Sequence, residues 1–208
     1  SVNPGIPKLK VTPEGWRRVA LGVHLYEVKR PAKLTADQEY TLVTVKRSRG
    51  GVIKREKLRG AEIKTPTQFF VKDNDFLISR RQIVHGACGL VPVELDGAIV
   101  SNEYAVLDTD GEIDLGFLRY LSETHYFQQT CFHSSIGVHV EKMVFKLNRW
   151  LKWQFNIPPL TEQHKITEVL GLWDSAIKTT YALLSVTKKE KLCLSKKLLG
   201  PAHPGEWK

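Results

Sequence analysis

The order of apolar and polar residues divides the chain into a strand-rich part and a helical tail. Up to about residue 106, apolar runs are short, rich in β-branched and aromatic residues, and separated by turn-forming residues, which is typical of β-strands. The turns are expected at Gly50-Gly51, at 72–75 and at Asp96-Gly97. The expected strands are 16–25, 40–45, 52–57, 69–71, 76–78, 86–93, 98–106 and, later in the chain, 153–157.

Two later segments have helical periodicity. Residues 114–129 carry apolar residues at helical spacing and predict one helix, with Asp114 near its N-cap. Pro158-Pro159 then marks a boundary, because two prolines fit neither the interior of a helix nor a strand ladder. Thr161 follows as a candidate cap for a second helix, which should stop near Gly200-Pro201.

This last helix carries a coiled-coil pattern from Ile166 onward, with apolar residues spaced alternately by four and three. The residues expected to pair with another helix are Ile166, Leu170, Trp173, Ile177 and Leu184. A helix of about 35–40 residues would be about 55 Å long, more than a small domain covers, so its partner is another long helix in this chain or another. A shorter, broken helix packed on its own domain is the alternative.

The pattern therefore predicts an α+β protein: a β-rich globular domain at 1–157 and a long, pairing helix at 158–200. Residues 201–208 would form a linker. Pro13-Glu-Gly-Trp-Arg17 is echoed by Pro204-Gly-Glu-Trp-Lys208, so a second domain–helix unit would begin there. Coincidence is the alternative for so short an echo.

Composition narrows the class of protein. Hydrophobic residues make up 42% of the 208 and charged residues 25%, as in globular proteins. No apolar run reaches the roughly 18 residues of a membrane span. The three cysteines are odd in number and widely spaced, which argues against a disulfide framework and favours the cytoplasm.

Positive charge is concentrated near the start of the chain. Residues 1–60 hold 14 Lys and Arg against 5 Asp and Glu, and this segment accounts for the whole net charge of +9. The densest part, 46–59, surrounds the Gly50-Gly51 turn. A basic hairpin of this kind suits a phosphate backbone, and a solvated basic surface is the alternative.

Catalytic motifs are weak. No phosphate loop or Gly-x-Gly-x-x-Gly is present, and Asn156-Ile-Pro-Pro-Leu160 only resembles a methyltransferase turn. Asp37 and the Glu62-Ile-Lys64 triplet have the form of a metal-dependent nuclease core. His85, Cys88, Cys131 and His133 could ligate zinc, although their spacing matches no finger pattern. We therefore expect no catalytic residue, metal or cofactor.

Two segments resemble the specificity subunits of type I restriction–modification systems. Asn74-Asp-Phe-Leu-Ile-Ser-Arg80 is similar to that family's Gly-Asp-Ile-Leu-Ile-Ser-Arg strand, with Asn74 in place of Gly. Phe155-Asn-Ile-Pro-Pro-Leu-Thr-Glu-Gln163 resembles the Pro-Pro-Leu-x-Glu-Gln signature that opens a long helix. With the Pro13–Trp16 opening, the resemblance covers nearly the whole chain.

The resemblance implies a noncatalytic subunit that reads one half of a bipartite site in double-stranded DNA. Its partners would be methyltransferase (modification) subunits and a restriction motor-nuclease subunit. Members of the family usually contain two domain–helix units, so this chain would be a fragment or a half-size subunit that forms a homodimer through the long helix.

Residue chemistry suggests which side chains contact DNA, because arginine and amide side chains read bases while lysine binds phosphate. The base-reading candidates are Arg47, Arg49, Arg55, Arg80, Arg81 and Gln82, and the phosphate candidates are Lys46, Lys54 and Lys57. For Arg80 and Arg81 a surface salt bridge is an equal alternative, and 134–139 is a second candidate loop. A nuclease and a non-DNA interaction protein with a basic surface remain the competing functions.

Overall fold

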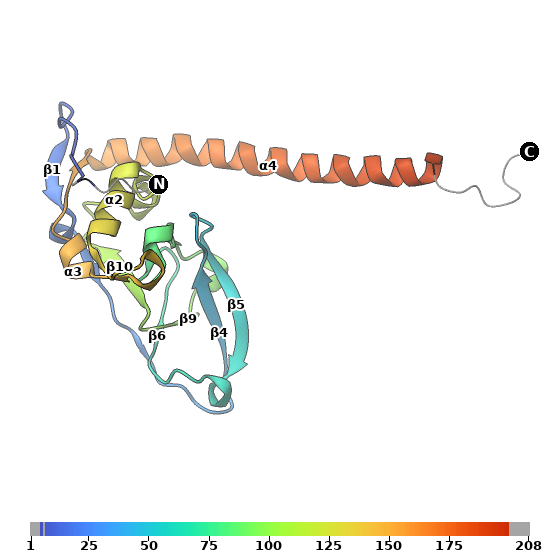
Figure 1. Cartoon of the computed structure of the whole chain (residues 1–208), viewed down its shortest axis with the longest axis horizontal. Helices are drawn as coiled ribbons and strands as arrows, with labels where there is room; N and C mark the ends of the chain where they lie inside the picture. The colour runs from blue at the N-terminus through green and yellow to red at the C-terminus, as the bar shows by residue number, and fades with distance from the viewer. Residues whose placement is uncertain (1–4, 6, 200–208) are drawn as a thin grey trace, which may run out of the picture. The chain divides into compact units, whose positions relative to one another are not determined.

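The computed structural model describes residue 5 and residues 7–199. It divides into two units, residues 1–167 and residues 168–208, which are considered separately below. The fold is α+β, as predicted: the first unit is rich in strands, and a single long helix, α4 (Leu160–Leu199), begins at its end (Figure 1). No described helix is both long enough and apolar enough to cross a membrane.

The first unit contains short strands arranged in small sheets. A four-stranded sheet has the order β2-β10-β7-β8, a five-stranded sheet has the order β3-β6-β9-β4-β5, and β1-β13 and β11-β12 form two separate pairs. Every pairing is antiparallel except β4 with β9. The strands are β1 (Arg17–Ala20), β2 (Leu25–Glu27), β3 (Pro31–Ala32), β4 (Glu39–Val45), β5 (Val52–Arg59), β6 (Gln68–Phe70), β7 (Phe76–Ser79), β8 (Cys88–Leu90), β9 (Ile99–Ser101), β10 (Tyr104–Thr109), β11 (Ser135–Ile136), β12 (Val144–Phe145) and β13 (Gln154–Ile157).

The helical segment predicted at 114–129 is two helices. Both α1 (Leu115–Leu121) and α2 (His125–His133) have their own N-cap, and a third, short helix, α3 (Leu147–Trp150), follows later. Asp114 caps α1 by accepting from the Phe117 amide at 2.6 Å, as predicted, and Thr124 caps α2 through the Phe127 amide at 3.3 Å. The Thr124 hydroxyl satisfies an N-terminal amide, which favours a new helix start over continuation.

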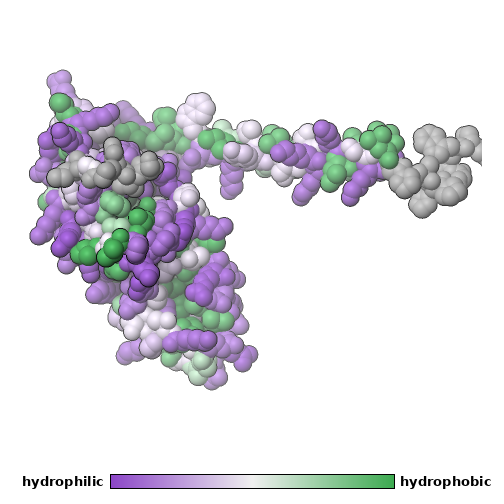
Figure 2. All heavy atoms as spheres, in the orientation of Figure 1, coloured by the Kyte–Doolittle hydropathy of each residue, from purple (hydrophilic) through white to green (hydrophobic). Residues whose placement is uncertain are grey.

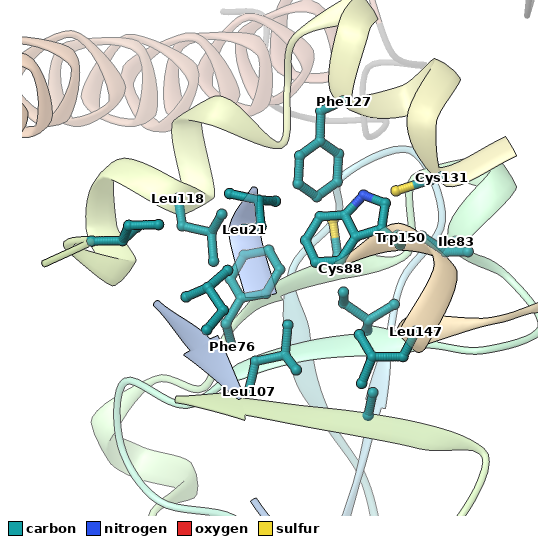
Figure 3. Close-up of a cluster of buried hydrophobic side chains, with 14 of the residues drawn as sticks. Leu21, Phe76, Ile83, Cys88, Leu107, Leu118, Phe127, Cys131, Leu147 and Trp150 are labelled. Atoms are coloured by element: carbon teal, nitrogen blue, oxygen red, sulfur yellow. The ribbon is translucent and has the colours of Figure 1, made fainter. Parts of the chain in front are cut away.

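The main core lies where these helices cover the four-stranded sheet. Trp150 is fully buried, stacks edge-on against Phe127 with 5.1 Å between ring centroids, and donates from its indole nitrogen to Thr130. Figure 3 shows Phe127 and Cys131 from α2 beside this tryptophan, with Phe76 from β7 nearby. A second cluster, including Val43, Leu77 and Val100, joins the four- and five-stranded sheets.

The ends of the first unit meet in the β1–β13 pair, where Arg17 lies opposite Ile157 and Ala20 opposite Gln154. The first strand of the unit therefore lies beside its last strand. The Trp16 indole donates to Glu162 at 3.1 Å and so ties the entering segment to the first turn of α4.

The first two turns of α4 belong to the globular unit. Gln163 is fully buried: its amide nitrogen donates to the carbonyls of Glu112 and Pro158, and its oxygen accepts from the Asp114 amide at 2.8 Å. Ile166 packs on the main core. The helix begins at Leu160, one residue earlier than the predicted cap at Thr161, and the predicted stop at Gly200-Pro201 lies outside the described residues.

Candidate nucleic-acid interface

The basic hairpin is formed by β4, β5 and the turn at 46–51. Its tip is held in a fixed shape: Ser48 and Arg49 have left-handed backbones with φ of 55° and 60°. The Ser48 amide donates to the His85 carbonyl at 2.7 Å, and the Arg49 amide donates to the Gly86 carbonyl at 3.1 Å. The tip therefore lies against the turn that follows β7. The structure thus brings together the two predicted DNA-contacting segments, the basic hairpin and the turn that begins with Arg80.

The side chains at the hairpin tip are all exposed, but only some are paired. Arg47 donates to Glu141 at 2.8 Å. Lys46 and Arg49 form no ion pair with any described residue, so the tip carries positive charge that is not neutralised within this part of the chain. A patch of this kind is suited to an anionic partner.

Strand β5 carries the other predicted basic residues and lies at the edge of its sheet, paired only with β4. Lys57 pairs with Glu39 at 2.7 Å and Arg55 with Glu56 at 2.9 Å, while Lys54 forms no ion pair among the described residues. Charged side chains on an edge strand also prevent pairing with other strands. Their position therefore has a structural explanation besides DNA contact.

Arg80, Arg81 and Gln82 follow directly after β7. Arg80 is half-buried and pairs with Glu27 on β2 at 2.6 Å, and Arg81 is exposed and pairs with Glu103. Both arginines therefore form the salt bridges that were the predicted alternative to base contact. The side-chain oxygen of Gln82 is buried and accepts no hydrogen bond from any described residue.

A hollow beside Arg80 contains two cationic residues, Lys146 and Arg149, that were not predicted from the sequence. It has a volume of about 540 Å³ and is lined by Glu27, Arg80, Ile136, Val144, Phe145, Lys146, Leu147, Asn148 and Arg149. The sequence feature that could have indicated this hollow is the close spacing of Lys142, Lys146 and Arg149 between apolar residues, most of which are buried in the structure. The predicted loop at 134–139 reaches this region through Ile136, and Ser134 and Ser135 are buried.

The aspartate of the strand motif has a structural role. Asp75 is buried, and its carboxylate accepts from both terminal nitrogens of Arg30, at 2.6 and 3.1 Å, and from the Lys72 amide at 2.7 Å. These bonds close the turn between β6 and β7 and fix the start of the strand that ends at Arg80.

The proposed nuclease residues do not form a metal site in the described part of the chain. Glu62 accepts from the Arg59 amide at 2.7 Å and so caps the short turn at 60–62. Asp37 and Lys64 are exposed. Across the described residues, no group of three His, Cys, Asp or Glu side chains is placed to hold a metal ion.

The proposed zinc ligands are likewise not gathered into a site. Burial raises the pKa of Cys88 to about 11 and that of Cys131 well above its ordinary value, and among the described residues neither belongs to a group of three side chains that could hold a metal ion. The His133 ring bonds to the Gly5 carbonyl at 2.8 Å, and His85 faces Glu141.

The residues predicted to pair along α4 divide between the two units. Ile166 is partly buried against the core of the first unit, whereas Leu170, Trp173, Ile177 and Leu184 are exposed in the second. Figure 2 shows apolar and polar side chains interspersed along the described length of this helix. A second apolar row, one residue earlier in register, was missed: Val169, Leu172, Leu183 and Val186 are also exposed.

No family model matches the chain, and no curated protein gives a significant match. Several solved structures match the chain. An HsdS subunit from Thermoanaerobacter tengcongensis aligns over 93% of this chain with a TM-score of 0.69 and 20% identity. A chain from a structure of the type I R-M system, described for its complex assembly and conformational transition, aligns over 94% with a TM-score of 0.68 and 20% identity.

A third solved structure has the same fold. The S subunit of a type I restriction–modification system from M. genitalium aligns over 94% of the chain with a TM-score of 0.56 and 16% identity. The chain spans about half of each of these proteins: 51%, 52% and 49% of their lengths. It therefore has the fold of type I specificity subunits, as the sequence resemblance predicted.

Proposed function

We propose that this chain is a noncatalytic, sequence-specific DNA-binding specificity subunit of a type I restriction–modification system. Its fold is that of HsdS subunits over nearly its whole length, and this observation carries the proposal. In this role residues 1–157 form a target recognition domain that reads one half of a bipartite site in double-stranded DNA. Residues 158–200 form the spacer helix.

The DNA-contacting surface we propose centres on the hairpin tip and the turn after β7. Lys46 and Arg49 are exposed and form no ion pair with described residues, so they are available to phosphates or bases. Arg47, Arg80 and Arg81 are paired with carboxylates, which DNA would have to displace. Lys54, Arg55 and Lys57 on the neighbouring edge strand would add attraction to the backbone, and Gln82 would need its turn to open before reaching a base.

The second unit suits assembly with other helices. Its two exposed apolar rows are one residue apart in register, which places them about 100° apart around the helix. One row can pack against a spacer helix, either from a second copy of this chain or from a second unit of a longer subunit. The other row is then available to a methyltransferase subunit, and the assembled complex would bind the restriction motor-nuclease subunit.

The test is DNA binding followed by site mapping. The purified chain should bind short duplex DNA at low salt, and its affinity should fall steeply as salt is raised, because basic residues displace counterions from phosphates. Replacing Lys46 and Arg49 with Ala should weaken this binding without unfolding the protein. Replacing Lys189 and Lys191 on α4 is a control with the same loss of charge.

Methylation-site mapping of the assembled complex then tests sequence reading. A bipartite motif that changes when the 46–51 and 80–86 loops are exchanged would support the proposal. A folded chain with no duplex affinity at low salt would contradict it and favour an interaction protein. Duplex cleavage with Mg²⁺ that is lost in Glu62→Ala would favour the nuclease.

A further inference from the structure

Three segments of the first unit meet at one carboxylate. Glu141, in the short turn at 140–142, places one oxygen 2.8 Å from the Arg47 guanidinium and the other 3.3 Å from the Nε2 atom of His85. Arg47 belongs to the hairpin tip and His85 to the turn after β7. The carboxylate thus occupies a fork between two nitrogen donors that come from different loops.

The two loops that form the fork are fixed to each other before any ligand binds. The amides of Ser48 and Arg49 bond to the carbonyls of His85 and Gly86, so the backbone positions of Arg47 and His85 are linked directly. Gly86 has φ of 76°, a left-handed conformation that favours glycine, and an added Cβ would lie at ordinary contact distance, 3.5 Å, from the Arg49 nitrogen. These backbone hydrogen bonds therefore hold the two loops together independently of Glu141.

Glu141 itself is held weakly. The Glu141 side chain is 62% exposed and the Arg47 side chain is 51% exposed. Exposed ion pairs of this kind contribute little to stability. The His85 nitrogen is buried, lies within ion-pair distance of the carboxylate, and makes no hydrogen bond to any described residue. An anion that fits the fork better can thus displace Glu141 by rotating one exposed side chain.

The geometry points to a phosphate-binding fork formed by Arg47 and His85, which Glu141 fills while the protein is free. A phosphodiester, like a carboxylate, offers two oxygens that two neighbouring nitrogen atoms can contact, and arginine binds both groups. The inference rests on the proposed function, because it assigns this site to the backbone of duplex DNA. Glu141 then lowers affinity for DNA of any sequence and leaves base contacts to determine binding.

The test compares two variants with the same change in net charge. Glu141→Gln should bind a short duplex of arbitrary sequence about two- to fivefold more tightly than the unmodified protein at low salt, the range expected for removing an exposed ion pair. Glu94→Gln removes an exposed carboxylate that forms no ion pair with any described residue, and its affinity should be unchanged. Equal tightening in both variants would mean that only net charge matters, and would overturn the inference.

A second comparison tests Arg47 as the phosphate ligand. Arg47→Gln should weaken duplex binding more in the Glu141→Gln background than in the unmodified protein, because Glu141 no longer masks the arginine. Equal losses in the two backgrounds would overturn the masking role. Absence of duplex binding by the unmodified protein would instead overturn the proposed function, so the two failures are distinguishable.

Discussion

At the scale of single residues, three residues in the motifs that resemble specificity subunits have structural roles. Asp75 closes a turn, Gln163 fastens the base of α4, and Trp16 bonds to Glu162. The sequence marked these residues as a pattern, but each has a distant partner: Arg30 lies 45 positions from Asp75, Glu112 lies 51 positions from Gln163, and Glu162 lies 146 positions from Trp16. Periodicity reports local backbone preference and contains no information on contacts this distant, so the roles of these residues could not be predicted.

The Asp75 carboxylate offers a direct test of such a role. Asp75→Asn removes the charge that faces Arg30 within a buried site and should lower the free energy of unfolding by about 2–3 kcal/mol. Asp73→Asn, an exposed neighbour, should change it by less than about 0.5 kcal/mol. Urea titration followed by tryptophan fluorescence measures both. Equal, small effects would show that the buried pair is not stabilising.

The three cysteines should differ in reactivity. Burial raises the pKa of Cys88 to about 11 and that of Cys131 well above its ordinary value, whereas Cys193 is exposed on α4. Because the thiolate is the reactive form, iodoacetamide at pH 8 should modify Cys193 alone in the folded protein, and all three after unfolding in guanidinium. Mass spectrometry of the digested protein shows which cysteines have been modified. Rapid modification of Cys88 in the folded state would contradict its burial.

At the scale of elements, regular patterns were predictable and interruptions were not. The strands flanking Gly50-Gly51, the strand at 154–157 and the 40-residue length of α4 all followed from residue spacing. The break between α1 and α2 did not, because the Thr124 cap competes with an apolar pattern that continues across it. Of the candidate site, the basic loops were predictable, but Glu141 and the hollow at Lys146 depend on tertiary contacts.

The contacts at the base of α4 should determine how much stability the chain loses when it is truncated. A chain ending at Ile157 loses buried Gln163 and the Ile166 side chain that packs on the core, so it should be less stable by several kcal/mol. A chain ending at Glu168 keeps both and should unfold cooperatively, close to the full-length midpoint. Thermal unfolding followed by circular dichroism in the near ultraviolet compares them. Equal stability of the two truncated chains would show that the helix base is dispensable.

At the scale of the whole molecule, the second unit exposes more apolar surface than an isolated helix should. Trp173 is 66% exposed, and a helix in a protein gains most of its stability by packing its apolar face against other elements. We therefore expect α4 to be covered by other helices in the assembled protein.

Charged substitutions along one row should disrupt that assembly. Replacing Leu170 and Ile177 with Asp should reduce the mass of the assembly measured by light scattering, because two carboxylates would be buried where this row packs against another helix. Ser175→Asp with Ala182→Asp adds the same charge on the opposite face, and the mass should remain that of the unmodified protein. If neither pair of substitutions changes the mass, the row at Leu170 is not an interface.

The pairing of β1 with β13 has a genetic consequence. Because the first and last strands of the globular unit lie side by side, the gene segment for residues 17–157 encodes a body whose two ends meet. Exchange of this segment for another with the same paired ends would leave the flanking chain where it was, since neither end needs to move. Recombination could then supply a new exposed surface in one step, provided that the incoming segment also packs on Gln163 and Ile166 at the base of α4.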